Sequence, residues 1–330
     1  MRISTLEHAQ PILVTGGTGF LGRAIVAALL AEGAVVRVAA RRPDRLPPEL
    51  KAAERFTADL AAPETFEPAL EGVGTVIHTA VSYGGFERQQ QINVEGSRAL
   101  AVMAAERGVQ RFIHISSLAV YGYRHSGIIT EDTPPVPSHD PYSLTKRAAE
   151  KAVTTVDGLN WVILRPGAIY GPYAPLWTDA LFRLARRRPF FFIGDGSGKL
   201  PFIHVDDVVE AALRVIDAPA ALHQAFNVVH PNPVTWRDVL KAYADYANQP
   251  LHWHSVPVAL ASVAAQLAAF TSPQPSMRAA LPELLHFLQH APTFSVAKMQ
   301  RLLGWEPTIT LAEGIQRTRA YLDHLMEPNT

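Results

Sequence analysis

Tyr142 and Lys146 lie four positions apart and form the pair of side chains in this sequence that is best suited to moving a proton. In a helix, this spacing puts both side chains on the same face. A free phenol has a pKa of about 10, and a neighbouring ammonium favours the phenolate and lowers that pKa. We therefore expect Tyr142 to act as an acid or a base on a substrate oxygen, with Lys146 tuning its pKa.

Ser117 is the third candidate for a role in this chemistry. It directly follows the short apolar run Phe112–Ser116, which is typical of a strand buried on both faces. Ligands of open α/β sheets bind at the carboxyl ends of the strands, where the Ser117 hydroxyl could hydrogen-bond the substrate oxygen. The spacing of Tyr142 and Lys146 occurs by chance in many helices, so the assignment depends on the other features of the chain.

A glycine-rich turn, TGGTGFLG from Thr15 to Gly22, lies between the first expected strand and the first expected helix. Gly16 permits a tight turn, and Gly19 lets the backbone approach a pyrophosphate at the positive N-terminus of the helix. Gly22 allows the helix and the strand to pack closely. We therefore predict a dinucleotide site, in which Lys146 also holds the nicotinamide ribose. In this turn the predicted cofactor contacts are Gly16, Thr18, Gly19, Phe20, Leu21 and Gly22.

The end of the second expected strand indicates which dinucleotide is bound. NAD sites place an acidic residue there, about 20 residues on, to bind the ribose 2′-hydroxyl. This sequence has Ala40 followed by Arg41 and Arg42, and a guanidinium can bind a phosphate with two hydrogen bonds. We therefore predict NADP(H) in preference to NAD(H); the alternative is that the two arginines form a solvated turn. Asp59 could accept a hydrogen bond from the adenine amino group.

The first two-thirds of the sequence alternate short apolar runs with longer amphipathic ones. This alternation predicts an α/β fold of the Rossmann type, with a doubly wound parallel sheet. The expected strands are Ile12–Thr15, Val35–Ala39, Val76–Thr79, Phe112–Ser116, Trp161–Leu164 and Ala225–Val229. The expected helices are Leu21–Glu32, Ile92–Arg107, Tyr142–Val156 and Val205–Ile216.

Beyond Pro166 the alternation loosens, and from about Thr235 the sequence is mostly helical. We expect a dinucleotide-binding domain made of residues 1–165 and about 202–217. A smaller, mostly helical C-terminal substrate lobe is expected from residues 166–201 and 218–330. The predicted walls of the substrate pocket are Ser82–Phe86, Leu118–Arg124, Gly167–Leu181 and helices after Pro257.

The composition excludes several classes of protein. The 330 residues include 30 basic and 30 acidic side chains, so the basic footprint of a nucleic-acid binder is absent. The sequence has no cysteine, which excludes disulfides and thiolate chemistry. No metal site is expected. His252 and His254 alternate as on one face of a short strand, and His204 lies just before Asp206 and Asp207, so we interpret these histidines as hydrogen-bonded structural residues.

The sequence also favours a cytoplasmic protein. Residues 1–10 are polar and contain no recognisable signal peptide. No apolar run reaches the roughly 18 residues of a membrane-spanning helix. The nearest candidate, Val256–Phe270, is interpreted as a helix of the substrate lobe; a patch that lies on a membrane surface is the alternative.

These motifs, in this order, resemble the extended short-chain dehydrogenase/reductases over nearly the whole chain. Besides the glycine turn, the matching segments are HTA (His78–Ala80), NVEG (Asn93–Gly96), ISSLAVYG (Ile115–Gly122), PYSLTK (Pro141–Lys146), LRPGAIYGP (Leu164–Pro172), GDGSGKLPFIHVDD (Gly194–Asp207) and LGWEP (Leu303–Pro307). The resemblance implies that Ser117, Tyr142 and Lys146 are catalytic. It also implies a homodimer formed through paired helices of the first lobe. Further cofactor contacts are implied at Leu60, Thr79, Ala80, Val81, Asn93, Pro166 and Gly167.

Two departures narrow the substrate class that the resemblance implies. Sugar dehydratases of this family carry acidic residues after the catalytic hydroxyl, whereas Leu118 and Ala119 follow Ser117 here. Nucleotide-sugar epimerases usually have an arginine that grips the diphosphate where this chain has Leu200. The sequence is more similar to the 3β-hydroxysteroid dehydrogenase and dihydroflavonol reductase branch, notably at VRVAAR in the second strand and at Val234–Arg237.

The resemblance therefore implies an NADP(H)-dependent oxidoreductase that interconverts a bulky, apolar secondary alcohol and its ketone. A nucleotide-sugar epimerase that holds NAD tightly is the alternative enzyme. A cofactor-sensing binding protein is a third interpretation, but a sensor needs none of Ser117, Tyr142 and Lys146.

Overall fold

The computed structural model describes residues 10–187, 190–251, 253–261, 263, 283 and 285–327. A sheet of seven parallel strands dominates it, in the order β12-β7-β5-β4-β1-β2-β3. The chain builds the sheet outward from β1 in one direction and then from β4 in the other, which confirms the doubly wound Rossmann-type fold. The strands are β1 (Ile12–Thr15), β2 (Val36–Ala40), β3 (Glu54–Thr57), β4 (Thr75–His78), β5 (Arg111–Ile115), β7 (Trp161–Pro166) and β12 (Gln224–Val228).

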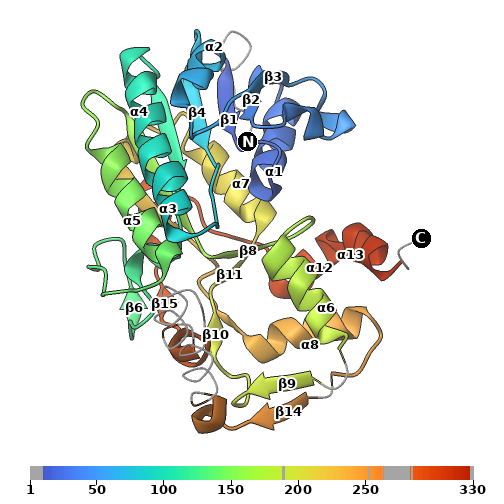
Figure 1. Ribbon diagram of the computed structural model, residues 1–330. Coiled ribbons are helices and arrows are strands. Elements are labelled where there is room, and N and C mark those ends of the chain that lie inside the picture. The colour runs from blue at the N-terminus through green and yellow to red at the C-terminus, as the bar shows by residue number, and fades with distance from the viewer. Residues whose placement is uncertain are drawn as a thin grey trace.

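Helices cover both faces of this sheet (Figure 1). The main covering helices are α1 (Phe20–Ala31), α4 (Ser97–Glu106), α5 (Pro141–Thr154) and α7 (Val205–Arg214). Successive strand residues face opposite cores: Ile12 and Val14 pack with α1 and α7, whereas Leu13 packs with α4. Burial on both faces explains why these strands are continuous apolar runs without polar alternation.

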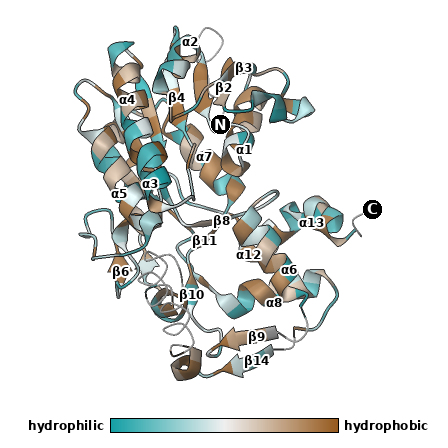
Figure 2. Cartoon of the chain, viewed as in Figure 1, coloured by the Kyte–Doolittle hydropathy of each residue, from teal (hydrophilic) through white to brown (hydrophobic). Residues whose placement is uncertain are grey.

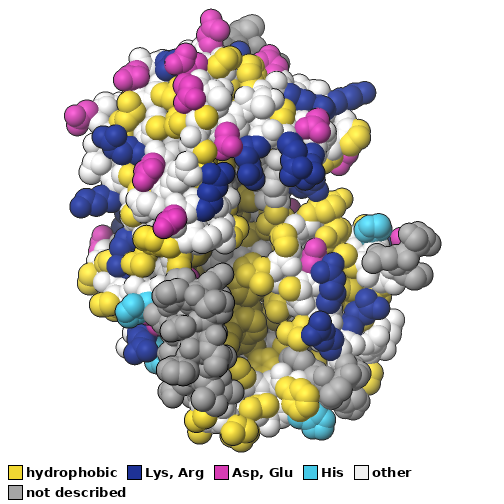
Figure 3. Space-filling view, in the orientation of Figure 1, with side chains coloured by type: hydrophobic (Ala, Val, Ile, Leu, Met, Phe, Trp, Pro, Cys, Tyr) yellow, Lys and Arg dark blue, Asp and Glu magenta, His cyan; other side chains and the backbone are white. Residues whose placement is uncertain are grey.

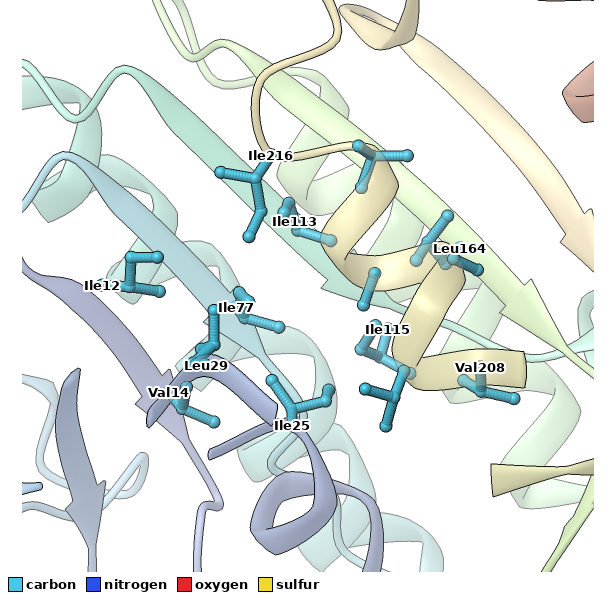
Figure 4. Packing of buried hydrophobic residues seen from close by; sticks show 14 of the residues in the cluster. Ile12, Val14, Ile25, Leu29, Ile77, Ile113, Ile115, Leu164, Val208 and Ile216 are labelled. Carbon is cyan, nitrogen blue, oxygen red and sulfur yellow. The ribbon is translucent and has the colours of Figure 1, made fainter. Parts of the chain in front are cut away.

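The core between the sheet and the helices α1 and α7 forms the platform beneath the glycine turn (Figure 4). Ile25 and Leu29 of α1 are fully buried there, as are Ile77 of β4 and Val208 of α7. Each buried methylene stabilises the fold by about 0.8 kcal/mol. Figure 2 accordingly shows hydrophobic strands inside the large lobe and hydrophilic residues on the outer surfaces of its helices.

Most predicted element boundaries lie within one or two residues of the observed ones. The strand predicted at Val35–Ala39 is β2, and the helix predicted at Tyr142–Val156 is α5. The helix predicted at Ile92–Arg107 begins earlier, because α3 (Phe86–Gln89) and a π-helical turn, η5 (Gln90–Gly96), lead into α4.

A second, smaller lobe lies beyond the carboxyl edge of the sheet (Figure 1). Its core contains Phe182, Tyr243 and Leu322, which lie on three different helices. Its helices are η7 (Pro175–Ala180), α6 (Leu181–Ala185), α8 (Trp236–Tyr246), α12 (Leu311–Arg317) and α13 (Arg319–Met326). Its strand pairs are β8 (Ala168–Tyr170) with β11 (Phe202–His204), β9 (Phe190–Ile193) with β14 (Trp253–Val256), and β10 (Lys199–Leu200) with β13 (Val234–Thr235).

Several short elements lie between the main helices and strands along the chain. They are η2 (Pro43–Arg45), η3 (Pro48–Leu50), η4 (Pro63–Phe66), α2 (Glu67–Leu70), η6 (Leu118–Tyr121), β6 (Ile128–Ile129), η8 (Pro219–Ala221), β15 (Thr293–Phe294) and α11 (Ala297–Leu303).

The boundary between the lobes differs from the one expected from the sequence. The prediction assigns residues 218–330 to the second lobe, whereas β12 is an edge strand of the large sheet and pairs in register with β7. Met299 and Trp305 also pack in the core of α1 and α7. β12, Met299 and Trp305 therefore belong with the large lobe. The rest of the predicted division into two lobes stays a prediction. The predictions for His252 and for most of Val256–Phe270 lie outside the described residues.

Candidate active site

Ser117 begins a short helical turn just after β5. Its Oγ accepts a hydrogen bond of 3.2 Å from Ala119 N, at the start of η6. The hydroxyl uses a lone pair for this cap and keeps its proton for another acceptor. Ser117 is therefore held in place by its own backbone and can still donate to an oxygen in the site.

Tyr142 lies in the first turn of α5, and hydrogen bonds hold that turn beside Ser117. Asp140 caps the helix by accepting a bond of 2.9 Å from Ser143 N. Ser143 Oγ donates to Ala119 O at 2.7 Å, which ties α5 to the turn that Ser117 begins. The Ser117 hydroxyl lies near enough to the Tyr142 phenol to influence its pKa. Two of the side chains that the sequence predicts as catalytic thus come together.

The pKa of the Tyr142 phenol differs from the sequence-based expectation. Burial raises this pKa well above its usual value, the neighbouring Tyr83 phenol raises it further, and the Ser117 hydroxyl opposes the rise. The Lys146 ammonium, which was expected to lower this pKa, is not among the groups that shift it. Tyr142 is therefore a neutral phenol at physiological pH and is poised to donate a proton.

Lys146 points into the protein, where its charge is stabilised by the backbone. The side chain is buried, and Nζ donates to Ile115 O at 2.7 Å. Burial lowers the pKa of this ammonium to about 8, and the nearby Glu150 carboxylate opposes the shift. Lys146 is consequently still mostly charged at neutral pH, as the predicted role requires.

Two buried histidines of neighbouring strands lie close to this ammonium. The rings of His78 and His114 are 5.3 Å apart between centroids. Burial, and then the charge of Lys146, lowers the pKa of His78 to about 3 and holds the pKa of His114 well below its usual value. His78 is hydrogen-bonded to Thr15 Oγ1 at 2.7 Å and to Ser97 Oγ at 2.8 Å. Both histidines are neutral and supply no second acid.

The glycine turn has the backbone shape that a bound pyrophosphate requires. Gly16 has a φ of +70°, and a Cβ there would lie 2.9 Å from the Cα of Ala80. α1 begins after Gly19 without a side-chain cap, so its first amides are not occupied by a capping oxygen. The other predicted contacts in this turn, Thr18, Phe20 and Leu21, lie around the same helix start. The turn therefore fits a dinucleotide.

Close packing between the first helix and the sheet depends on a residue that the sequence reasoning missed. The prediction gives this role to Gly22, but a Cβ on Gly22 would overlap the carbonyl oxygen of Gly16 within the turn itself. A Cβ on Gly17 would instead lie 2.8 Å from the Val38 side chain of β2. In the sequence, the second glycine of the pair Gly16 and Gly17 was the signal that could have revealed this contact.

The segment after β4 passes against the glycine turn and is fixed from two sides. Thr79 Oγ1 donates to Thr15 O at 2.7 Å, next to Gly16. Asn93 Oδ1 accepts from Ser82 N at 2.7 Å, and Asn93 Nδ2 donates to Ser82 O at 3.0 Å. Asn93 thus holds the loop that follows Val81, and its contact with the cofactor stays a prediction.

The residues predicted to bind the adenosine end lie at the ends of β2 and β3. Arg41 and Arg42 have exposed side chains, and in the part of the chain that the structure describes neither guanidinium has a hydrogen-bond or ion-pair partner. Asp59 is half-buried, and its Oδ1 accepts from Ala61 N at 3.0 Å. Leu60 is buried beside it. Two cationic groups are thus exposed at the edge of the sheet that the sequence predicts for the adenosine end of the cofactor.

The turn predicted to hold the nicotinamide end also lies at the carboxyl edge of the sheet. Pro166 ends β7, and Gly167 N donates to Val228 O at 3.0 Å. A Cβ on Gly167 would overlap the carbonyl oxygen of Pro201. Only glycine therefore fits at the point where the chain crosses into the second lobe.

Arg23, in the first turn of α1, makes a contact that the sequence reasoning missed. Its guanidinium carbon lies 4.4 Å from the centre of the Tyr173 ring, and that ring is 4.5 Å from the ring of Tyr321. Tyr173 has a φ of 69°, which is uncommon for a residue other than glycine. These contacts join the helix of the glycine turn to the second lobe, and no local pattern in the sequence indicates them.

The face between the two lobes is hollowed (Figure 3). Hydrophobic side chains line much of the hollow, and Lys and Arg side chains gather along its upper rim. Leu200, where epimerases were expected to carry an arginine, is fully buried in the core of the second lobe. That position therefore offers the hollow neither a charge nor a hydrogen-bond donor.

Neither a metal-binding cluster nor a membrane-spanning helix occurs among the described residues. Within those ranges, no group of three His, Asp or Glu side chains could hold a metal ion, and no helix is both long and apolar enough to cross a bilayer. His204 caps α7, with its Nδ1 accepting from Asp206 N at 3.3 Å. His254 is exposed on β14.

Comparison with known proteins assigns the family. Residues 12–228 match the NAD dependent epimerase/dehydratase family. The chain belongs to this family. Members of the NAD dependent epimerase/dehydratase family use the extended short-chain dehydrogenase/reductase fold that the seven-stranded sheet displays, and the chain is an NAD(P)-dependent enzyme of this type.

Individual members of the family act on different substrates. The chain is 32% identical over 237 residues to the ceramide reductase of Caulobacter vibrioides, covering 71% of this chain and 69% of the relative. It is 28% identical to the decarboxylating sterol-4-alpha-carboxylate 3-dehydrogenase of Mus musculus, covering 97% and 93%. Its structure also resembles that of the Thermus thermophilus UDP-glucose 4-epimerase complex with NAD, with a TM-score of 0.74, 25% identity and coverage of 95% and 99%.

Proposed function

We propose that this enzyme is an NADP(H)-dependent oxidoreductase that interconverts a bulky, apolar secondary alcohol and the corresponding ketone. The observation that carries the proposal is the joint placement of Ser117, Tyr142 and Lys146 at the carboxyl edge of the sheet. A hydroxyl donor, a neutral phenol and a buried ammonium are the groups that alcohol and ketone redox chemistry needs.

The chain's own residues hold the substrate oxygen and move a proton. When bound, the nicotinamide supplies a hydride to the carbonyl carbon or accepts one from the alcohol carbon. Ser117 Oγ donates a hydrogen bond to the substrate oxygen. The Tyr142 phenol gives its proton to that oxygen during reduction and takes it back during oxidation. Lys146 stabilises the resulting phenolate by its charge and holds the ribose.

The apolar substrate class is supported by the walls of the hollow. Leu200 is buried where an epimerase would carry an arginine for a diphosphate, and hydrophobic side chains line the hollow (Figure 3). The names of two relatives, a ceramide reductase and a sterol-carboxylate dehydrogenase, also denote lipid substrates. Desolvation of these apolar walls favours a substrate that is itself apolar.

The choice of NADP(H) is supported by Arg41 and Arg42. Both guanidinium groups are exposed at the end of β2, where an NAD site would place a carboxylate. A cytoplasmic location is also part of the proposal. A homodimer through paired helices of the first lobe is proposed from the family resemblance.

A nucleotide-sugar epimerase that uses NAD is the second candidate. The similarity to an epimerase structure with bound NAD favours it. In that reaction the same hydride leaves and returns to the opposite face of the substrate, so no external cofactor is consumed. Co-purification of tightly bound NAD would accompany this activity.

A cofactor-absorbance screen distinguishes the two candidates. The purified protein is mixed with NADPH or NADH and with steroid, flavonoid and aromatic ketones, and UDP-sugars form the contrast set. Our proposal predicts oxidation of NADPH with at least one apolar ketone and a slower rate with NADH. Conversion of a UDP-sugar without added cofactor, with no ketone reduced, would establish the epimerase instead.

A further inference from the structure

Arg23 carries a positive charge for which the described part of the chain offers no anionic partner. It is the fourth residue of α1, and its backbone N–H donates to Gly19 O at 3.0 Å, so it lies one helical turn from the glycine turn. Among the described residues its guanidinium makes no hydrogen bond or ion pair, and Nε is shielded from water. A shielded donor without an acceptor is costly, so an acceptor brought by a ligand would stabilise it.

An aromatic platform fixes the direction of this guanidinium. Its central carbon lies 4.4 Å from the centre of the Tyr173 ring, and the Tyr173 ring lies 4.5 Å from the ring of Tyr321. The Tyr321 hydroxyl in turn donates to Asp179 Oδ1 at 2.9 Å. A guanidinium that stacks by its flat face keeps the N–H groups at its edge available for an oxygen ligand.

The backbone of Tyr173 is held in a conformation that costs free energy. Its φ of 69° lies in the left-handed region, which residues other than glycine rarely adopt. The next residue anchors the loop, because Ala174 O accepts hydrogen bonds from Thr178 N at 3.1 Å and from Asp179 N at 3.0 Å. Strain of this kind persists only where the surrounding structure enforces it, and it clusters at sites that clamp ligands. The position of the Tyr173 ring beside Arg23 is therefore set by the fold.

The electrostatics of the glycine turn favour an anion that also reaches Arg23. The turn from Thr15 to Gly22 contains no charged side chain, and the first turn of α1 contains no acidic one. The helix N-terminus carries about half a positive charge, so a cation in its first turn is unfavourable unless an anion offsets both. A dinucleotide bound at this turn brings its pyrophosphate to the same helix end. Phosphate oxygens accept strong, charge-assisted hydrogen bonds from a guanidinium.

We propose that Arg23 binds the pyrophosphate of the cofactor and that Tyr173 is the positioning residue that orients its guanidinium. The second lobe thereby takes part in holding the nucleotide as well as the substrate. The inference rests on the part of the proposed function that seats a dinucleotide on the glycine turn, and it does not depend on which ketone is reduced. Arg23 does not distinguish NADPH from NADH, because both contain the same pyrophosphate.

Arg23→Met tests the contact, because it removes the charge and keeps an unbranched apolar side chain against Tyr173. Calorimetric titration compares variant and wild type with NADPH, NADH, ADP-ribose and 2′-AMP. The first three ligands contain the pyrophosphate, whereas 2′-AMP contains only the phosphate that we assign to Arg41 and Arg42. We expect a roughly tenfold to hundredfold loss of affinity for the first three ligands and an unchanged affinity for 2′-AMP.

Two further variants show whether this pattern is specific to Arg23. Arg41→Ala should give the reciprocal result, with weaker binding of NADPH and 2′-AMP and unchanged binding of NADH and ADP-ribose. Arg237→Met is the matched control, because the Arg237 guanidinium also stacks on an aromatic ring, at 5.0 Å from that of Trp253, but lies on α8 of the second lobe. All four affinities of this control should equal those of wild type.

Substitutions of Tyr173 separate a positioning role from a merely structural one. Tyr173→Leu removes the platform, so the affinity for ADP-ribose should fall by about threefold to tenfold, whereas Tyr173→Phe keeps the ring and should bind as wild type does. In the Arg23→Met background, Tyr173→Leu should cause no further loss, because the ring acts through the guanidinium. Additive losses would show that the two residues affect binding independently and would refute the positioning role.

Each outcome of the titrations bears on a separate statement. An unchanged affinity of Arg23→Met for ADP-ribose would overturn the pyrophosphate contact and leave Arg23 as a contact between the lobes. An equal loss for all four ligands would also overturn it, because 2′-AMP lacks the group that Arg23 is proposed to bind. A raised KM for a ketone with unchanged nucleotide affinities would assign Arg23 to the substrate instead. If wild type reduces no ketone but the titrations are as expected, the proposed function falls and the pyrophosphate contact stands.

Discussion

The Lys146 ammonium donates a hydrogen bond of 2.7 Å to the carbonyl oxygen of Ile115, at the last residue of β5. This bond fixes a buried charge at the end of the strand that leads to Ser117, one helical turn from Tyr142. The positive charge that α5 brings to the site is thus fixed in position by the backbone of the sheet. Because the charge is buried, it also makes stability depend on pH.

The first prediction concerns this dependence on pH. Burial lowers the pKa of Lys146 from 10.5 to about 8, so between these values the unfolded chain binds more protons than the folded one. The contribution of Lys146 to the free energy of unfolding therefore rises with pH across this interval, by up to about 3 kcal/mol at 1.36 kcal/mol per pKa unit. Lys146→Met should lack this rise. Urea unfolding of both proteins from pH 7 to 10.5 measures it, and parallel curves would refute the lowered pKa.

The second prediction concerns the proton donor. Tyr142→Phe removes the hydroxyl and keeps the ring against Tyr83, so turnover should fall by about 10²- to 10⁴-fold, the usual contribution of general acid catalysis. Cofactor affinity should change little, because Lys146 still holds the ribose. Ketone turnover and a fluorescence titration with NADPH give the two quantities. Equal turnover in variant and wild type would remove Tyr142 from the mechanism.

The third prediction concerns the choice of nucleotide. Arg41→Ala and Arg42→Ala should each weaken NADPH binding by roughly tenfold to a hundredfold, since a hydrogen bond to a charged group contributes about 1.5–3 kcal/mol. NADH binding should be nearly unchanged, because NADH has no 2′-phosphate. Arg98→Ala, which removes another exposed arginine on α4, is the control. Calorimetric titration of each variant decides the matter; equal losses for the two nucleotides would contradict a phosphate contact.

The fourth prediction separates two roles of glycine. Gly16 and Gly108 both have a φ of +70°, but a Cβ at Gly108 would meet no atom within 4 Å, whereas one at Gly16 would meet Ala80. Gly108→Ala should cost about 1 kcal/mol of unfolding free energy for the backbone conformation alone. Gly16→Ala should cost about 1–3 kcal/mol more through overpacking, and should weaken cofactor binding. Denaturant unfolding compares them, and equal costs would mean that the contact with Ala80 relaxes freely.

The sequence was sufficient for six of the seven strands of the sheet, all except β3, because the pattern of a buried strand is local. An apolar run between turn residues predicts a buried strand, and β2 is displaced from its predicted bounds by only one residue. The spacing of Tyr142 and Lys146 fixes their relation on any helix. The glycine turn could be recognised because its residues are contiguous.

Features that depend on tertiary contacts could not be predicted in the same way. The rise in the pKa of Tyr142 follows from burial, which the spacing to Lys146 does not reveal. Arg23 meets Tyr173 only after the chain has crossed into the second lobe. Tyr83 belongs to a segment predicted to line the pocket, but its stacking on Tyr142 depends on anchors at Gln89 and Asn93.

The return of the chain to the sheet in α7 and β12 has a consequence for modularity. β12 completes the sheet edge beside β7, and α7 covers the face shared with α1, yet both follow part of the second lobe in the sequence. A fragment ending at residue 165 would leave the β7 edge open to pairing with other chains. Substrate preference therefore cannot be transplanted between relatives by a single crossover, and a chimaera would need two separate grafts into an uninterrupted nucleotide-binding frame.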